Sequence, residues 1–243
     1  MDQTETALVR TLEDELSKSL RELCRSEHRL SFWRKQPCPW VTYEDLLPSD
    51  VYRRLAADFP PLSVFRKDEG RLRHGQRPHD RYYLALKDNP KNLGEISARQ
   101  LPIIWQSLVD TIHGENYLQF ASEMLGQRPH KIRLAWHMSH RGSEVSPHKD
   151  SKEKLGTQIF YFSDEESWDP KWGGDTLLLS KPTIAAEGPD FHEFESQLQI
   201  EQFTNQSLFF MRTESSWHGV RRLDCPIGRF RKTFHVIFER ARS

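Results

Sequence analysis

The sequence predicts an α+β protein, with helices in its first half and short antiparallel β-strands in its second half. Near the amino end, leucines recur every three or four residues, which is the spacing of an amphipathic helix. From about residue 131, apolar and polar residues alternate in short runs that turns separate, as is typical of strands. Because no helical pattern lies among these runs, we expect an antiparallel sandwich or barrel.

Three helices are expected before the strands. Residues 4 to about 30 form the first, and its leucines either pack on the domain core or form a dimer contact. The second runs from about residue 48 to residue 57, with Ser49 or Asp50 as its cap, and prolines at 60–61 end it. The third spans residues 99–112, with its large apolar side chains on one face.

Residues 62–90 are rich in charge and are expected to form a loop. Basic side chains outnumber acidic ones there: Arg66, Lys67, Arg71, Arg73, Arg77 and Arg81 against Asp68, Glu69 and Asp80. Such a loop is either a solvated surface or a mouth that attracts an anionic substrate.

The strands are expected in five short segments. They are residues 131–138, 157–162, 176–179, 207–211 and 232–238. Residues 180–206 form a long connection between two of them, which we interpret as a lid or a surface excursion. We therefore divide one integrated domain into an N-terminal helical supporting region with a substrate-side loop, residues 1–130, and a β core, residues 131–243.

The composition argues against several classes of protein. The 35 basic and 35 acidic residues balance, whereas nucleic-acid binders usually carry a basic excess. The cysteines, Cys24, Cys38 and Cys225, form no CxxC pair and suit a reducing compartment. No apolar run resembles a signal peptide or is long enough to cross a bilayer. We expect a cytoplasmic monomer or homodimer with neither nucleic-acid nor membrane partners.

Two histidines and one aspartate form a candidate metal site. Residues two apart on an extended segment point to the same side, so His148 and Asp150 can offer a nitrogen and an oxygen to one ion. His218, about 70 residues later, follows a predicted strand and would complete the set. Two histidines and one carboxylate leave one face of an octahedral Fe(II) open, which oxygen chemistry requires.

The last predicted strand carries a candidate carboxylate anchor. Phe234 and Val236 share one of its faces, and Arg231, Thr233 and His235 share the other. If the apolar face packs on the helices, Arg231 points inward. A buried guanidinium requires an anionic partner, and its planar fork suits a carboxylate.

These segments and their order resemble the 2-oxoglutarate/iron oxygenase superfamily, in its prolyl-hydroxylase-like branch. The resemblance covers roughly residues 130–240. The HxD pair of the family resembles His148 and Asp150, and its distal histidine resembles His218. The Gly-Gly strand entry of the family resembles residues 172–177. The resemblance implies a double-stranded β-helix, a jelly-roll core of the cupin type.

The resemblance also implies a cosubstrate site. Arg231 would bind the far carboxylate of 2-oxoglutarate, with Thr233 at the position where the family has Thr or Ser. Residues 159–163 resemble the strand whose tyrosine reaches the same carboxylate, which gives that role to Tyr161. Arg229 lies two residues before Arg231 and is the competing anchor.

The chemistry implied is that of an Fe(II)- and 2-oxoglutarate-dependent dioxygenase, which uses O2 and releases succinate and CO2. Hydroxylation of an unactivated C–H bond is the expected outcome, because halogenating relatives replace the carboxylate that Asp150 retains. A small molecule, possibly anionic, is the expected substrate, such as an amino acid or a biosynthetic intermediate. The alternatives are a hydroxylase of prolyl or other protein residues and a non-catalytic jelly-roll that binds a ligand.

Some histidines and tryptophans near these motifs remain open to two interpretations. His137, His140 and His235 are structural residues or line a pocket, and a zinc hydrolase would use His137 and His140 with His148. Core packing or substrate contact is possible for three tryptophans: Trp168, Trp172 and Trp217.

Replacing Arg231 with alanine is expected to weaken 2-oxoglutarate binding strongly. A buried charge pair that loses one partner costs about 3–5 kcal/mol. Isothermal titration of 2-oxoglutarate into the metal-loaded variants Arg231→Ala and Arg229→Ala measures the effect. Intact affinity in Arg231→Ala with lost affinity in Arg229→Ala would show that Arg229 is the anchor.

Overall fold

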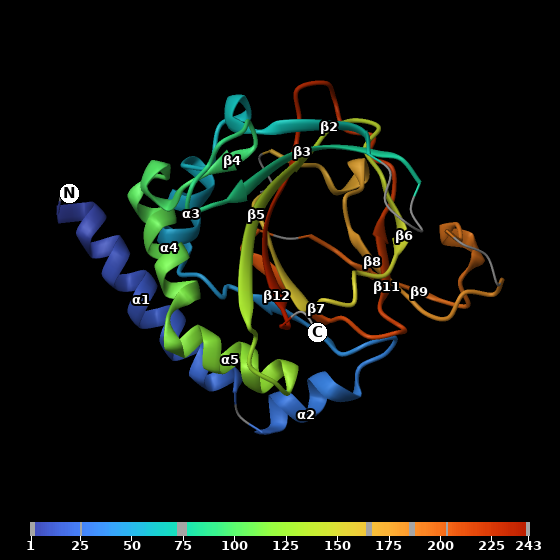
Figure 1. The fold of residues 1–243 in the computed structure, drawn as a ribbon, viewed down its shortest axis with the longest axis horizontal. Helices are drawn as coiled ribbons and strands as arrows, with labels where there is room; N and C mark the ends of the chain where they lie inside the picture. Colours follow the sequence, from blue (N-terminus) through green and yellow to red (C-terminus); the bar gives the residue numbers. More distant parts are fainter. Residues whose placement is uncertain are drawn as a thin grey trace.

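Two antiparallel β-sheets face each other, and helices cover the outer face of the larger one (Figure 1). The computed structural model describes residues 3–24, 26–71, 77–163, 167–184, 188–202 and 204–241. No helix in these ranges has both the length and the apolar character needed to span a bilayer. Mixed helices and antiparallel sheets agree with the predicted α+β class.

The larger sheet contains most of the strands. Its order is β1 (Trp40–Glu44), β10 (Gln206–Met211), β7 (Lys154–Tyr161), β12 (Arg231–Glu239), β5 (Lys131–Ser139), β3 (His79–Leu86) and β2 (Arg66–Arg71), and the short β4 (Glu95–Ile96) runs parallel to β3. The smaller sheet has the order β6 (Val145–His148), β11 (Trp217–Val220), β8 (Thr176–Leu179) and β9 (Gln197–Ile200). Each strand expected from the sequence is present, with bounds shifted by three residues or fewer.

Five α-helices and four short 3₁₀ helices are found among the described residues. The α-helices are α1 (Gln3–Leu23), α2 (Ser26–Arg34), α3 (Ser49–Ala57), α4 (Ile103–His113) and α5 (Glu115–Leu125). The 3₁₀ helices are η1 (Leu62–Val64), η2 (Ala98–Gln100), η3 (Pro170–Trp172) and η4 (Phe191–Glu193).

The alternation predicted for β12 separates the core from the space between the sheets. Phe234, Val236 and Phe238 are buried in the main apolar core, together with side chains of the helices. Trp105 of α4 packs edge-on against Phe234, at a ring distance of 5.2 Å. The opposite face of β12 therefore points away from the helices, as we expected for Arg231.

The first expected helix is two helices. α1 ends at Leu23 and α2 begins at Ser26, with the acidic Glu27 in its first turn, which favours a helix start. The leucines of α1 pack on the domain core, and Leu12, Leu16 and Leu20 are fully buried there. Their burial confirms the core interpretation over the dimer contact.

The other helix expectations need smaller corrections. Pro48 occupies the cap position of α3, and no side chain caps that helix, so Ser49 and Asp50 do not have the expected role. The third expected helix is η2 followed by α4, because Pro102 starts a new helix. The sequence reading missed α5 altogether.

The described part of the charged segment 62–90 consists mainly of β2 and β3 and is not the expected loop. β2 and β3 form a hairpin at the sheet edge, where charged strands are common. Asp68 forms ion pairs with Arg66 at 2.7 Å and Arg81 at 3.3 Å. Arg66 and Arg81 are thus paired within the hairpin. Arg81 also lines the cavity between the sheets, so both alternatives for this segment stay open. Arg73 lies outside the described residues.

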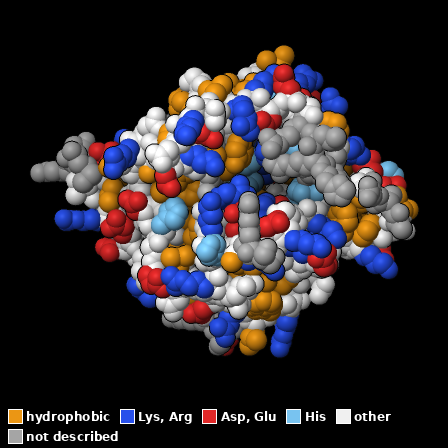
Figure 2. Space-filling model, viewed as in Figure 1, with side chains coloured by type: hydrophobic (Ala, Val, Ile, Leu, Met, Phe, Trp, Pro, Cys, Tyr) orange, Lys and Arg blue, Asp and Glu red, His pale blue; other side chains and the backbone are white. Residues whose placement is uncertain are grey.

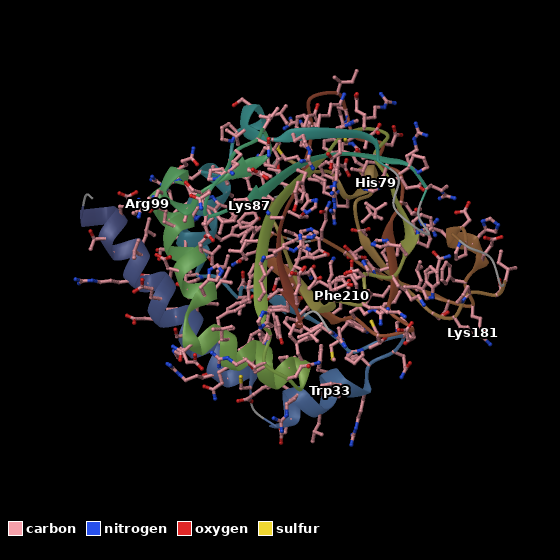
Figure 3. The ribbon with its side chains drawn as sticks, in the orientation of Figure 1. Trp33, His79, Lys87, Arg99, Lys181 and Phe210 are labelled. Atoms are coloured by element: carbon pink, nitrogen blue, oxygen red, sulfur yellow. The ribbon has the colours of Figure 1, made fainter. Side chains whose placement is uncertain are left out.

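The connection 180–206 also contains regular structure. It contains the 3₁₀ helix η4 and the strand β9, and β9 extends the smaller sheet by pairing with β8. In Figure 3, Lys181 lies at the periphery of the molecule, as do Trp33 and Arg99, whereas His79 and Phe210 lie between the sheets.

Replacing Tyr117 with phenylalanine is expected to destabilise the fold by about 1–3 kcal/mol, because a buried acceptor loses its donor. The Tyr117 hydroxyl donates to Gln158 Oε1 at 2.5 Å, and Gln158 Nε2 donates to Ser207 Oγ at 3.0 Å, which joins α5 to β7 and β10. Urea unfolding measures the loss. Tyr82→Phe is the control, because within the described residues the Tyr82 hydroxyl has no hydrogen-bond partner. Equal stability of both variants would contradict this account.

Candidate metal centre

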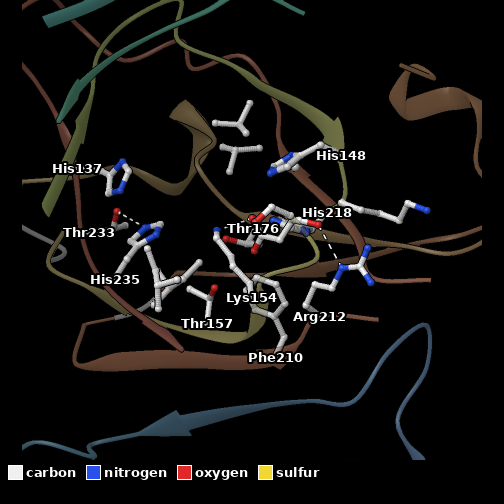
Figure 4. Close-up of a pocket in the computed structure, with 18 of the residues that line it drawn as sticks. His137, His148, Lys154, Thr157, Thr176, Phe210, Arg212, His218, Thr233 and His235 are labelled. Carbon is white, nitrogen blue, oxygen red and sulfur yellow. Dashed lines mark hydrogen bonds and ion pairs between the residues drawn. The ribbon is translucent and has the colours of Figure 1, made fainter. Parts of the chain in front are cut away.

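Strand pairing in the smaller sheet places two histidines side by side. His148 on β6 and His218 on β11 are direct partners in the antiparallel register. Their rings lie 4.2 Å apart between centroids (Figure 4). The pairing of β6 with β11 therefore brings together two histidines that lie far apart in the sequence.

Both rings are held in the same orientation by the backbone. His148 Nδ1 donates to Ser146 O at 3.0 Å, and His218 Nδ1 donates to Ser216 O at 3.0 Å. A carbonyl oxygen can only accept, so Nδ1 carries the proton in each ring and Nε2 keeps its lone pair. Metal-binding histidines are commonly oriented by this type of contact.

Asp150 completes the group, just beyond the end of β6. One donor atom from each of His148, Asp150 and His218 lies within 4.8 Å of the others. In the part of the chain that the structure describes, no other histidine, cysteine or carboxylate cluster meets this criterion. Two imidazole nitrogens and a carboxylate oxygen suit a divalent metal such as Fe(II).

The local charges favour the protonation states that a metal requires. Burial, and then the neighbouring His218, lower the pKa of His148 to about 3, and burial lowers the pKa of His218. Burial alone would raise the pKa of Asp150, but the Lys154 ammonium and the two histidines hold it below its usual value. At neutral pH the group therefore offers two neutral imidazoles and an ionised carboxylate.

Lys154 is a charged neighbour of the group that the sequence reading missed. Its Nζ lies 2.5 Å from Asp150 Oδ1. Lys154 stands at the start of β7, four residues after Asp150, and it points into the space between the sheets. A lysine so close to an HxD pair is the only sequence signal that could have indicated this contact.

Arg231 is buried on the inner face of β12. Its Nε donates to Gly174 O at 2.6 Å, and one terminal nitrogen donates to Thr176 Oγ1 at 3.4 Å. Among the described residues, no carboxylate forms an ion pair with it. The charge of Asp175 acts on Arg231, but its carboxylate accepts hydrogen bonds from Gln199 and Gln202 instead. Burial lowers the pKa of Arg231, so the guanidinium lies in a place that favours an added anion.

Glycine is required where the chain passes this guanidinium. Gly174 has a φ of +103°, in the region that favours glycine. A Cβ there would lie 3.0 Å from Arg231 Cδ and 2.7 Å from Gln202 Nε2. The second glycine of the predicted Gly-Gly entry thus makes room for the Arg231 side chain.

The remaining predicted cosubstrate residues lie in different surroundings. Thr233 lines the cavity, and its Oγ1 lies 3.0 Å from His235 Nε2. Tyr161 lies behind the cavity wall, where its hydroxyl hydrogen-bonds to Thr176 Oγ1 at 2.8 Å and its ring lies 5.5 Å from the Arg231 guanidinium. Burial raises the pKa of Tyr161, so its hydroxyl is neutral.

Arg229 is not on the inner face that we predicted for it. It lies in an exposed turn before the first residue of β12, where strand alternation does not apply. Within the described residues, it does not line the cavity. Arg231 is therefore the better placed of the two candidate anchors.

The candidate ligands and Arg231 line one cavity of about 900 Å³ between the two sheets. Histidine and basic side chains surround a hollow on the face shown in Figure 2. Several further lining residues were not predicted from the sequence. They come from β3, β5 and β7 and from the segment that follows β10: His79, Tyr83, Arg133, Lys154 and Arg212.

The histidines left open by the sequence divide into two groups. His137 and His235 line the cavity, with rings 4.2 Å apart on the wall opposite the candidate ligands (Figure 4). His140 packs on Tyr82 and bonds to the carbonyl of Arg141. In the described ranges neither His137 nor His140 joins the candidate metal group, which is unfavourable for the zinc-hydrolase alternative.

The three tryptophans near the motifs also differ. Trp217 lines the cavity. Trp168 and Trp172 pack edge-on at a ring distance of 5.4 Å, in a small apolar cluster with Leu223 and Cys225. The latter two tryptophans are therefore packing residues.

Comparison with known proteins gives similarities in structure only. No protein-family model matches the chain, and no curated protein sequence does. A prolyl hydroxylase from Trichoplax adhaerens, in complex with a hypoxia inducible factor peptide fragment, is similar with a TM-score of 0.55 and 10% identity; 98% of this chain and 94% of that chain are covered. An oxidoreductase of the 2OG-Fe(II) oxygenase family from Burkholderia pseudomallei has a TM-score of 0.54 and 13% identity, with 88% and 91% covered.

A third structure is the epimerase SnoN in complex with Fe3+, alpha ketoglutarate and nogalamycin RO. Its TM-score is 0.51 at 11% identity, and 92% of this chain and 84% of that chain are covered. The chain has the fold of the 2OG-Fe(II) oxygenases. The similarity to prolyl hydroxylases agrees with the branch that the sequence resembles.

Replacing His148 or His218 with alanine is expected to weaken Co(II) or Ni(II) binding by at least about 100-fold, because even outer partners of a metal ligand contribute about 10- to 100-fold. Competition against a chelator of known affinity measures the change. His192→Ala is the matched control, since that imidazole is 79% exposed on η4 and away from the cavity. Equal metal binding by the three variants would contradict the assignment of this group.

Proposed function

We propose that the chain is an Fe(II)- and 2-oxoglutarate-dependent oxygenase that hydroxylates a C–H bond of a small molecule. The observation that carries this proposal is the meeting of two features in one cavity. One is the group of His148, Asp150 and His218, and the other is the buried Arg231, which pairs with no carboxylate among the described residues. The shared fold supports it.

The order of the strands supports the jelly-roll form of this fold. The strands from β5 to β12 alternate between the larger and the smaller sheet, except for β8 and β9, which are neighbours in the smaller one. We interpret these strands as the double-stranded β-helix and as the catalytic core, residues 131–243. Residues 1–130 would then be the supporting region, since α1, α4 and α5 cover the outer face of its larger sheet (Figure 1).

His148, Asp150 and His218 would hold the iron, with Nε2 of each imidazole and a carboxylate oxygen as the donors. Arg231 would bind the far carboxylate of 2-oxoglutarate, and Thr233 lines the cavity beside it. Tyr161 would act through Thr176, whose hydroxyl it shares with Arg231. When bound, iron and 2-oxoglutarate supply the oxidising power for O2-dependent hydroxylation, with succinate and CO2 as by-products.

The protein's own contribution is geometric and electrostatic. The backbone carbonyls of Ser146 and Ser216 fix the two imidazoles, so the donors need no rearrangement to bind an ion. Arg231 fixes one end of a dicarboxylate, which orients its other end toward the histidines. Phe210 packs on the His218 ring at 4.8 Å, so this side of the group is apolar and excludes water.

The cavity favours a small molecule over a folded protein segment as substrate. A volume of about 900 Å³ lies in the range of small-molecule sites. Basic side chains line it in excess of acidic ones, although the net charge of the chain is zero. An anionic substrate would be attracted to such a site. The similar structures contain both types of ligand, a peptide fragment in one and nogalamycin RO in another.

Asp150→Ala is expected to abolish turnover, because the variant loses the charged donor of the group. The measurement is succinate release from 2-oxoglutarate under air, with iron, ascorbate and a panel of amino acids, other small carboxylates and proline-containing peptides. Stimulation by a small carboxylate in the wild type supports the proposal, whereas stimulation by peptides alone would assign a protein substrate. Turnover by Asp150→Ala would exclude the carboxylate as a ligand, and Glu214→Ala, at the cavity rim, is the control.

A further inference from the structure

Lys154 has a contact that the proposed function leaves unexplained. Its ammonium forms an ion pair with Asp150, and the two side chains are 15% and 8% exposed. Charges this deeply buried require a partner. In this structure each is the partner of the other.

A metal that takes Asp150 as a ligand withdraws this negative charge from Lys154. The only other carboxylate that lines the cavity within the described residues is Glu214. Glu214 is 71% exposed and already forms ion pairs with Arg212 at 2.7 Å and Lys149 at 3.4 Å. Lys154 would therefore remain as a buried ammonium next to the candidate ligands, without an anion supplied by the cavity.

We propose that Lys154 binds a carboxylate of a small-molecule ligand beside the metal centre, and that it competes with the metal for Asp150. This inference rests on the proposed function. Arg231 is the anchor for a far carboxylate, so Lys154 forms a second, separate anchor for an anion. The carboxylate comes either from 2-oxoglutarate, at the end that faces the histidines, or from the substrate.

The position of Lys154 suits this role. It starts β7 on the larger sheet and reaches across the cavity to Asp150, which follows β6 of the smaller sheet. In Figure 4, Lys154 lies between the candidate ligands and the wall that carries His235 and Thr233. A carboxylate bound to the Lys154 ammonium would lie in the same cavity as the candidate metal ligands and Arg231.

The competition makes Lys154→Met distinctive, because two affinities are expected to change in opposite directions. Co(II) should bind about tenfold more tightly, since the variant lacks a cation that repels the metal and competes for Asp150. Carboxylate binding to the Co(II)-loaded protein should weaken about tenfold, since the anion loses its partner. A role in folding alone would weaken both. Lys154→Arg keeps the charge and should behave like the wild type.

Chelator competition measures Co(II) affinity in the full-length chain, and isothermal titration measures 2-oxoglutarate affinity in the Co(II)-loaded protein. Paramagnetic relaxation of acetate protons, with 2-oxoglutarate at saturation, reports a second carboxylate near the metal. A loss of 2-oxoglutarate affinity in Lys154→Met identifies the cosubstrate as the source. A loss of the acetate effect alone identifies the substrate.

Lys149→Met is the matched control, because Lys149 lines the same cavity but pairs with the exposed Glu214. Equal effects in both variants would overturn the specific role of Lys154, and so would unchanged carboxylate binding or weaker Co(II) binding in Lys154→Met. Failure of the wild type to bind Co(II) would instead reject the proposed function, and the inference with it.

Discussion

The antiparallel pairing of β6 with β11 is the constraint on which the candidate site depends. It sets His148 opposite His218 in one register, and a shift of one residue would turn one of the two rings to the other face of the sheet. The backbone carbonyls two residues earlier then fix both rings with Nε2 free. Asp150 lies two residues after His148, so this short segment is enough to bring its carboxylate to the two histidines. The site therefore follows from main-chain geometry, with little dependence on flexible side chains.

β12 connects this site to the core. Its alternating side chains bury Phe234 among the helices on one face and direct Arg231 into the cavity on the other. Packing of the helices thus fixes the depth at which the guanidinium lies. Among the described residues no carboxylate pairs with the buried Arg231, which would be unfavourable in a protein that bound no anion. In the proposed function, a dicarboxylate cosubstrate would supply this partner. In our account, the same strand stabilises the fold and positions the cosubstrate.

Local patterns in the sequence predicted five of the strands, and they named the three candidate ligands that the structure brings together. Period-two alternation predicted β5 and β12, β-branched and aromatic residues predicted β7, and the order of the motifs named the histidines and Asp150 as candidate ligands. Contacts between distant segments were not predictable in this way. The charge-rich sequence of β2 and β3 predicts a loop, because the ion pairs of Asp68 with Arg66 and Arg81 form only in the folded structure. Arg229 was placed by extending the alternation of β12 past its first residue, into a turn. Lys154 was missed because its partner is defined by the cavity and not by a motif.

The central claim is that the histidine–aspartate group and Arg231 form one site for a metal and 2-oxoglutarate. Anaerobic addition of 2-oxoglutarate to the Fe(II)-loaded protein tests it most directly, with visible absorption as the readout. Chelation of the iron by the keto acid is expected to produce a metal-to-ligand charge-transfer band in the wild type and no band in His148→Ala. A folded wild-type protein that binds Fe(II) but develops no band with 2-oxoglutarate would contradict the account.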